Sequence, residues 1–226
     1  MIAWFFDMDG TLFDSMPKHA AAWETVLARY GISFPAAECY RNEGKRGTDI
    51  IRECFREQLH REPSEEEAEA IYRVKSEMIT RTTDIQPIAG ALDVLRCLRD
   101  RGDALWIVTG SRQQSLFRQL DEAFPGMFSR ERMVTADDVL RGKPFPDPYI
   151  AAWQRASALQ KDLTKAGCRV VENAPLGVIS AKEAGMFTIA VNTGPLPDKD
   201  LWDASADRVF PSMCELKKYV LNNPSV

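Results

Sequence analysis

Short apolar runs alternate with helical patterns over most of the chain. Continuous apolar runs predict buried strands at Ile2–Phe6, Ala104–Val108, Arg169–Val171, Phe187–Val191 and Arg208–Phe210. Between the strands, apolar residues three or four positions apart predict helices at Gly90–Arg101, Ser111–Phe124, Pro146–Leu159 and Pro175–Ala184. Strands that alternate with helices in this way indicate right-handed βαβ crossovers. The predicted fold class is therefore α/β, with a doubly wound parallel sheet.

One long stretch after the first strand breaks this alternation. From about Met16 to about Ile79 the sequence contains only helical patterns, at Lys18–Tyr30, at Thr48–Leu59 and in a third helix that ends near Ile79. The third helix opens with Ser64-x-x-Glu67, the pattern of a capping box. We therefore expect an α-helical domain at residues 16–83, inserted into a sheet domain made of residues 1–15 and 84–226.

Composition and charge exclude several classes of protein. The 226 residues are 45% hydrophobic and 27% charged, which is ordinary for a globular protein and excludes a disordered or collagen-like chain. The formal charge of −4, from 29 basic and 33 acidic residues, offers no basic surface for nucleic acid or for a membrane. We expect neither as a partner.

The cysteines and the N-terminal apolar run bear on the compartment. The five cysteines form no CxxC pair, so neither a zinc site nor a disulfide framework is indicated. The run at Ile2–Phe6 is too short for a signal peptide or a membrane span. We expect a cytoplasmic protein with reduced thiols.

Polar and charged side chains follow the predicted strands at the edge where ligands of such sheets bind. Asp7-Met8-Asp9-Gly10-Thr11 follows the first strand, and Thr109-Gly110-Ser111 and Glu172-Asn173 follow two others. A loop between the last two adds Lys143. This combination suits phosphoryl transfer: carboxylates and an amide can bind Mg²⁺, one carboxylate can attack phosphorus, and a second can move protons.

Each of these signals alone is common, but their order and spacing resemble the haloacid dehalogenase superfamily. Asp7-Met8-Asp9-Gly10-Thr11-Leu12 is similar to its first motif, Thr109 to the second, Lys143 in KPxPxxY to the third and Glu172-Asn173 to the fourth. The run ENAPLGVISAKEAGM from Glu172 to Met186 resembles a subfamily pattern, EDSxxGxxAAxxAGM. The helical insert resembles the cap of the β-phosphoglucomutase-like branch.

The resemblance implies a Rossmann-like core with a mobile helical cap, and a role for each matching residue. Asp7 is expected to be the nucleophile and a Mg²⁺ ligand. Asp9 is expected to act as general acid and base, and to give its main-chain carbonyl to the metal. Thr109 and Lys143 are expected to stabilise phosphoryl oxygens, and Glu172 and Asn173 to complete the metal site.

Asn173 departs from the family pattern, which usually places an aspartate there. The amide oxygen can still coordinate Mg²⁺ but carries no charge. We therefore expect weaker metal binding than with an aspartate, unless Glu172 takes over. In an alternative interpretation, Asn173 only caps the helix that begins at Pro175.

Further residues are expected to bind the substrate. His19, at a spacing typical of the branch, is expected to reach Asp9 or a sugar hydroxyl. In Gly44-Lys45-Arg46-Gly47-Thr48, which imperfectly resembles a cap loop of the family, Arg46 is the candidate for an anionic group, with Lys45 as its rival. Lys75 is a candidate for the same cleft, and Gly110 and Ser111 border the phosphoryl position.

The residues favour a Mg²⁺-dependent phosphatase that acts on a small phosphorylated metabolite, such as a sugar phosphate, through an aspartyl-phosphate. The alternative is a β-phosphoglucomutase-type transfer between two hydroxyls of one sugar, for which the core would be the same. A phospho-acceptor module like a two-component receiver and a non-catalytic relative are further alternatives. Asp9 argues against a dehalogenase, whose motif lacks it. We expect a monomer, by analogy with other small capped enzymes.

Overall fold

The computed structural model describes residues 2–81, 85–111 and 114–223 and contains one six-stranded parallel sheet. The strands are β1 (Ala3–Phe6), β2 (Ala104–Val108), β3 (Met133–Val134), β4 (Cys168–Glu172), β5 (Phe187–Val191) and β6 (Arg208–Phe210). Their order in the sheet is β3-β2-β1-β4-β5-β6, and every neighbouring pair is parallel. This is the strand order of a Rossmann-like fold, so the predicted α/β class is confirmed.

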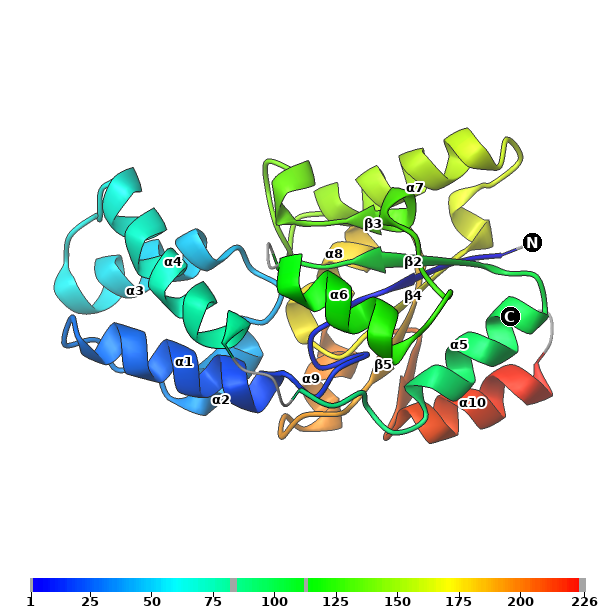
Figure 1. Ribbon diagram of the computed structural model, residues 1–226, viewed down its shortest axis with the longest axis horizontal. Helices are drawn as coiled ribbons and strands as arrows, with labels where there is room; N and C mark the ends of the chain where they lie inside the picture. The colour runs from blue at the N-terminus through cyan, green and yellow to red at the C-terminus, as the bar shows by residue number, and fades with distance from the viewer. Residues whose placement is uncertain (1, 82–84, 112–113, 224–226) are drawn as a thin grey trace.

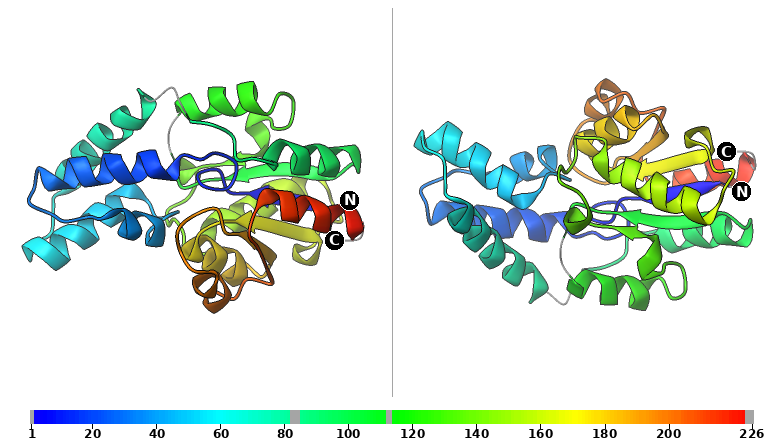
Figure 2. Two further views of the ribbon diagram at one scale, coloured as in Figure 1. Left: turned by 90° about the horizontal axis from the view of Figure 1, so that it is seen from below. Right: turned by 90° about the horizontal axis from the view of Figure 1, so that it is seen from above.

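Helices cover both faces of the sheet, as the apolar strands require (Figure 1, Figure 2). The core helices are α5 (Ala91–Asp100), α6 (Gln114–Ala123), α7 (Asp147–Leu159), α8 (Pro175–Glu183), α9 (Asp198–Asp203) and α10 (Met213–Asn222). Alternate residues of β1 point to opposite faces. Trp4 and Phe6 pack in the cluster with α5 and α10, whereas Ala3 and Phe5 pack in the cluster with α7.

A helical insert leaves the core after β1 and carries its own apolar core. Its helices are α1 (Met16–Ala28), α2 (Ala36–Arg41), α3 (Gly47–Leu59) and α4 (Glu65–Thr80). Their buried faces meet in a separate cluster that includes Trp23, Ile51 and Phe55. The insert lies beyond the carboxyl ends of the strands, and both chain termini lie at the opposite end of the molecule (Figure 1). The predicted boundary between the helical insert and the sheet domain lies between residues 83 and 84, and both of these fall outside the described residues.

The structure adds elements to those that the sequence predicted and shifts the ends of others. The additions are the two-residue strand β3, the short helices α2 and α9, and α10. Ser64 caps α4 by accepting a hydrogen bond from the Glu67 N–H (3.1 Å), but the Glu67 carboxylate pairs with Arg61 (2.7 Å) and does not complete the expected capping box. Residues 112–113, in the expected start of the Ser111–Phe124 helix, lie outside the described part.

Two further observations concern the helices and the cysteines. Across the described residues, no helix combines the length and apolar character that crossing a bilayer requires. The five cysteines are all free thiols, as expected from their spacing.

Candidate active site

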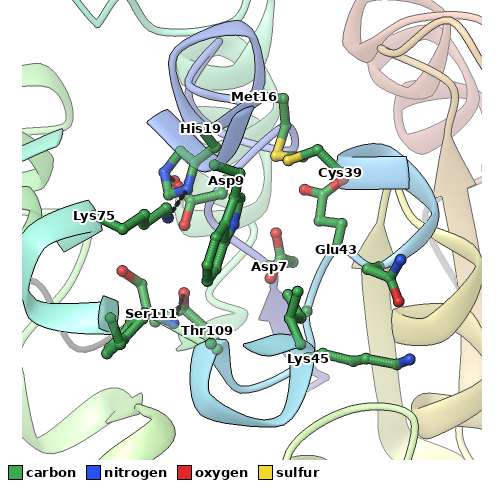
Figure 3. A pocket seen from close by; sticks show the side chains of 17 residues that line it. Asp7, Asp9, Met16, His19, Cys39, Glu43, Lys45, Lys75, Thr109 and Ser111 are labelled. Carbon is green, nitrogen blue, oxygen red and sulfur yellow. Dashed lines mark hydrogen bonds and ion pairs between the residues drawn. The ribbon is translucent and has the colours of Figure 1, made fainter. Parts of the chain in front are cut away.

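The buried charged side chains of the described residues gather at one place, between the carboxyl ends of the strands and the insert. They are Asp7, Asp9, Glu43, Lys75, Lys143 and Glu172. Burial of a charge is costly unless the charge is paired, so such a cluster indicates a functional site. Figure 3 shows Lys75 and His19 on one side of a cavity and Glu43 on the other, with Asp7 between them.

Lys143 joins the ends of three strands. Its ammonium donates to Asp7 Oδ1 (2.6 Å), to Glu172 Oε1 (2.6 Å) and to the main-chain carbonyl of Val108 (3.2 Å). Burial alone would lower the pKa of Lys143, but the two carboxylates hold the pKa above its usual value. Lys143 is therefore a permanent positive charge beside Asp7.

Glu172 is fully engaged by its neighbours. Oε1 accepts from Lys143 and from the Tyr149 hydroxyl (2.5 Å), while Oε2 accepts from the Asn173 N–H (3.2 Å). Gly177, in the first turns of α8, permits this close approach, because a Cβ there would lie 2.1 Å from the carboxyl group. Glu172, expected to be a metal ligand, is thus the partner of Lys143 in this structure.

Asp7 directs one carboxylate oxygen into the site without a partner. The Asp7 N–H donates to the Val171 carbonyl (3.0 Å) and extends the pairing of β1 with β4. Oδ1 binds Lys143, whereas the buried Oδ2 has no hydrogen-bond partner among the described residues. Burial raises the pKa of Asp7 well above its usual value, although Lys143 opposes the rise. An additional positive charge at Oδ2 would favour the ionised form.

Asp9 lies two residues further on, in surroundings that shift its pKa in the direction opposite to that of Asp7. The Ser15 hydroxyl donates to Oδ1 (2.6 Å), and His19 Nε2 lies 3.4 Å from the same oxygen. Burial alone would raise the pKa of Asp9, but His19 and Ser15 outweigh burial and lower it to about 2. The expected approach of His19 to Asp9 is therefore present in the structure.

Lys75 orients His19 from the other side. Its ammonium lies 2.7 Å from His19 Nδ1. An ammonium can only donate, so Nδ1 accepts and the ring proton sits on Nε2, toward Asp9. Burial lowers the pKa of Lys75 to about 8, and burial together with Lys75 lowers the pKa of His19. The imidazole is thus neutral at neutral pH.

The residues after β2 line the same cavity. Thr109 Oγ1 accepts from the Ser111 N–H (3.0 Å), which leaves the Thr109 hydroxyl free to donate into the cavity. Ser111 Oγ is buried there without a partner among the described residues. Gly110 is needed for close packing, because a Cβ would lie 2.7 Å from the Gly44 carbonyl of the insert.

Asn173 connects the core to a side chain that the sequence analysis missed. The Thr11 hydroxyl donates to Asn173 Oδ1 (2.9 Å), and Asn173 Nδ2 donates to Glu43 Oε2 (2.9 Å). Glu43 precedes the Gly44–Thr48 loop that was considered for substrate binding. No local pattern distinguishes Glu43 from the other glutamates of the insert, so only the fold identifies it.

The cavity between core and insert is small, about 60 Å³. Asp7, Asp9, His19, Lys75 and Thr109 line it. The structure does not bring Arg46 into this lining: its guanidinium donates to the Leu140 carbonyl on the core surface. Its rival Lys45 contributes to the lining, but the Lys45 ammonium pairs with Glu53 (2.5 Å).

Comparison with known families identifies this arrangement. The model of a family described as haloacid dehalogenase-like hydrolase matches residues 4–191, a span that contains the strand ends and the insert. The chain belongs to the haloacid dehalogenase-like hydrolase family. The resemblance expected from the four motifs is therefore confirmed, and the protein is an enzyme of this hydrolase family.

Relatives within the haloacid dehalogenase-like family include phosphatases. The chain is 32% identical to hexitol phosphatase A of Escherichia coli (strain K12), over 83% of this chain and 81% of that protein. It is 27% identical to a fructose-1-phosphate phosphatase of the same organism, over 82% of this chain and 94% of that protein. A solved structure from Bacteroides vulgatus, described as a candidate beta-phosphoglucomutase, has a TM-score of 0.93 and 40% identity, and the match covers 100% of this chain and 89% of that one.

The haloacid dehalogenase-like fold implies Mg²⁺, and the residues present can be tested against that ion. Across the described part of the chain, no three His, Cys, Asp or Glu side chains are arranged as a complete metal-binding group. The site does contain two buried carboxylate oxygens without hydrogen-bond partners, Asp7 Oδ2 and Glu43 Oε1. The Asn173 amide oxygen, which accepts from the Thr11 hydroxyl (2.9 Å), could add a neutral oxygen ligand. These are hard oxygen donors, so the residues fit Mg²⁺.

Proposed function

We propose that this protein is a Mg²⁺-dependent phosphatase that hydrolyses a small phosphorylated metabolite, such as a sugar phosphate, through an aspartyl-phosphate on Asp7. The observation that carries the proposal is the Asp7 carboxylate: one oxygen is held by Lys143, and the other faces the cavity without a partner. A carboxylate fixed in this way is suited to in-line attack on phosphorus.

In the first step, Asp7 attacks phosphorus, a bond forms between the carboxylate and the phosphoryl group, and the bond to the sugar oxygen breaks. Lys143 offsets the negative charge of Asp7, and the free Thr109 hydroxyl can donate to a phosphoryl oxygen. The departing oxygen receives a proton from Asp9. Asp9 is ionised in the free enzyme, so it first takes up this proton from solvent when the substrate's negative charge raises its pKa.

In the second step, Asp9 returns to the ionised form and accepts a proton from water, which attacks the phosphorus of the aspartyl-phosphate. Ser15 and His19 hold the Asp9 carboxylate in place for this role. When bound, Mg²⁺ would neutralise phosphoryl charge and is expected to be held by Asp7, the Asp9 carbonyl and Asn173. Inorganic phosphate then leaves, and Asp7 is regenerated.

The insert, at residues 16–83, would act as the mobile cap. The cavity has room for only a few waters, less than a sugar phosphate occupies. The insert must therefore open for the substrate to enter, and its closure excludes bulk water from the reacting groups. His19 and Lys75 on the insert would contact the bound substrate.

The test is a phosphate-release assay over a panel of hexose, hexitol and glycerol phosphates, with and without Mg²⁺. We expect saturable, Mg²⁺-dependent turnover of at least one sugar or polyol phosphate. Asp7→Asn, which preserves size and removes the nucleophilic charge, serves as the blank. Turnover by Asp7→Asn equal to that of the unaltered enzyme would refute the assignment of Asp7.

A phosphoglucomutase-type transfer is the second candidate. It is favoured by the B. vulgatus relative and by the small cavity beneath the insert, because a mutase must keep water from the aspartyl-phosphate. Incubation with β-glucose 1-phosphate distinguishes the two activities. Glucose 6-phosphate as the main product supports the mutase, and exclusive release of free phosphate supports the phosphatase.

A further inference from the structure

Asn173 of the core and Glu43 of the insert form a hydrogen-bonded pair across the boundary between core and insert. Asn173 stands where the family pattern usually has aspartate, so the core lacks one carboxylate. A carboxylate from the insert, Glu43, lies against the Asn173 amide (2.9 Å). The two side chains together therefore present the charge and oxygens that an aspartate at position 173 would supply.

Glu172 cannot replace the missing charge without losing its own contacts. Both of its oxygens accept hydrogen bonds, from Lys143, Tyr149 and the Asn173 N–H. Release of Glu172 would leave Lys143 and the buried Tyr149 hydroxyl without this partner. Glu43 is not held by contacts of this kind. Its Oε1 is buried without a partner among the described residues, and the residue is only 9% exposed.

The loop that carries Glu43 contacts the core directly. Gly44 (φ +87°) lies so close to Lys143 that a Cβ would approach the Lys143 Cδ to 2.6 Å. The Gly44 carbonyl in turn approaches Gly110 from the opposite side. Glu43 Oε1 lies beside Gly10, where a Cβ would meet it at 2.9 Å, so the carboxylate reaches the segment between Asp9 and Thr11. Separation of the insert from the core would therefore withdraw Glu43 from these groups.

The charge of the closed site leaves room for one divalent cation. The buried groups are four carboxylates and two lysines, so with all groups ionised two negative charges lack a partner. Asp7 Oδ2 and Glu43 Oε1 are both buried without a hydrogen-bond partner among the described residues. A divalent cation held by these residues would offset the excess negative charge.

We propose that Glu43 supplies, from the insert, the carboxylate that Asn173 lacks, so that Mg²⁺ binds tightly only when the insert is closed over the core. The inference rests on the proposed Mg²⁺ site and adds to it a ligand outside the core. Metal binding and closure of the insert are then linked, and each strengthens the other.

The first test measures Mg²⁺ affinity by isothermal titration calorimetry. Glu43→Gln keeps the shape and removes the charge, and we expect its Kd to rise about tenfold or more. Glu38→Gln is the matched control: Glu38 lies on α2 of the same insert and pairs with Arg41 at the surface. We expect its Kd to equal that of the unaltered protein. A Kd for Glu43→Gln that matches the Glu38→Gln control overturns the proposal.

The second test exchanges the two groups. In Glu43→Gln/Asn173→Asp the amide can donate to the new carboxylate, so the bridging hydrogen bond and the charge are both retained. We expect the affinity to return to within about threefold of the unaltered protein, as a double-mutant cycle with strong coupling requires. A double variant that binds no more tightly than Glu43→Gln overturns the proposal.

The third measurement follows closure without reference to activity. Small-angle X-ray scattering should show that Mg²⁺ shifts the unaltered protein toward the compact form. The exchanged variant should bind Mg²⁺ with little such shift, because its carboxylate belongs to the core. An equal shift in both proteins contradicts the linkage. If the unaltered protein does not bind Mg²⁺ at all, the proposed function itself fails, which is a distinguishable result.

Discussion

The core and the insert contribute to the same cavity in different ways. On the core side, Lys143, Asp7 and Glu172 form a network in which one ammonium is shared between two carboxylates at 2.6 Å each. On the insert side, Glu43 accepts one side-chain hydrogen bond from Asn173 of the core, and Lys75 contacts His19 within the insert. The groups that would break and form bonds are thus fixed on strand ends, whereas the groups that would select and enclose the ligand move with the helices.

Two aspartates on one segment extend this comparison. Asp7 faces the core network, and burial raises its pKa, whereas Asp9 faces the insert, where His19 and Ser15 lower its pKa to about 2. Environments that separate the pKa values of neighbouring carboxyl groups are typical of paired catalytic roles. The following predictions test whether the core side and the insert side differ as described, beginning with the largest expected effect.

Loss of the proposed nucleophile should have the largest effect. Asp7→Asn should lower kcat by a factor on the order of 10⁴ or more, because the amide cannot replace the carboxylate that is proposed to attack phosphorus. Steady-state phosphate release measures the loss, and circular dichroism checks that the fold persists. If kcat falls less than about tenfold, Asp7 is not the nucleophile.

Removal of the Lys143 ammonium, which Asp7 and Glu172 share, should destabilise the core side of the site in particular. Lys143→Met leaves Asp7 and Glu172 without their ammonium and should lower the free energy of unfolding by about 3–5 kcal/mol. Two buried carboxylates would then lack a compensating charge in the folded state. Stability lost at neutral pH should therefore return as the pH falls and both groups become protonated.

Urea denaturation of Lys143→Met at about pH 5 and pH 8 gives the measurement. The variant should be closer to the unaltered protein at the lower pH. An equal deficit at both values would mean that lost packing, and not uncompensated charge, causes the instability.

A substitution where the insert contacts the core should impair closure of the insert and leave the core intact. Gly44→Ala places a Cβ against Lys143 and should lower kcat/KM about tenfold to hundredfold through misplacement of the insert. Gly31→Ala is the matched control, because Gly31 has a similar positive φ (+73°) with nothing within 4 Å of its Cβ position. Both variants carry backbone strain, so equal losses of kcat/KM would show that contact with the core has no role.

The smallest effect concerns Lys75 and pH. The lowered pKa of Lys75, about 8, means that its positive charge is present below that pH and lost above it. KM for a phosphorylated substrate should therefore rise about fivefold between roughly pH 7 and pH 9, a loss of ~1 kcal/mol of attraction. Lys75→Met should have a raised KM without this pH dependence. A variant that keeps the same rise would assign it to another group.

Much of the core could be predicted from the sequence, because its signals are local. A buried parallel strand is a continuous apolar run, so β1, β2 and β5 were identified within one residue of their observed ends. The residues that follow these strands meet at one edge by topology alone, which is why Asp7 and Thr109 could be named together. The two-residue β3 and the short α2 and α9 contain too few positions to show a period.

The insert side of the site could be predicted only in part, because its contacts are not local. His19 was found through its spacing from Asp9, and Lys75 as a candidate on a helix. Glu43 approaches Asn173 across 130 positions of sequence, and no pattern near either residue indicates that contact. Arg46 was a candidate to bind an anionic group because it carries a positive charge in a loop that resembles a cap loop. Its guanidinium donates instead to the Leu140 carbonyl.

The most direct test of the account is chemical identification of the residue that carries the phosphoryl group. The enzyme, mixed with Mg²⁺ and a sugar phosphate that it hydrolyses, is quenched in acid and treated with borohydride, which reduces an aspartyl-phosphate to homoserine. Peptide mass spectrometry then locates the modified position. The account predicts reduction at Asp7 alone, dependent on substrate; reduction at any other residue, or phosphate bound to a side chain other than a carboxylate, would contradict it.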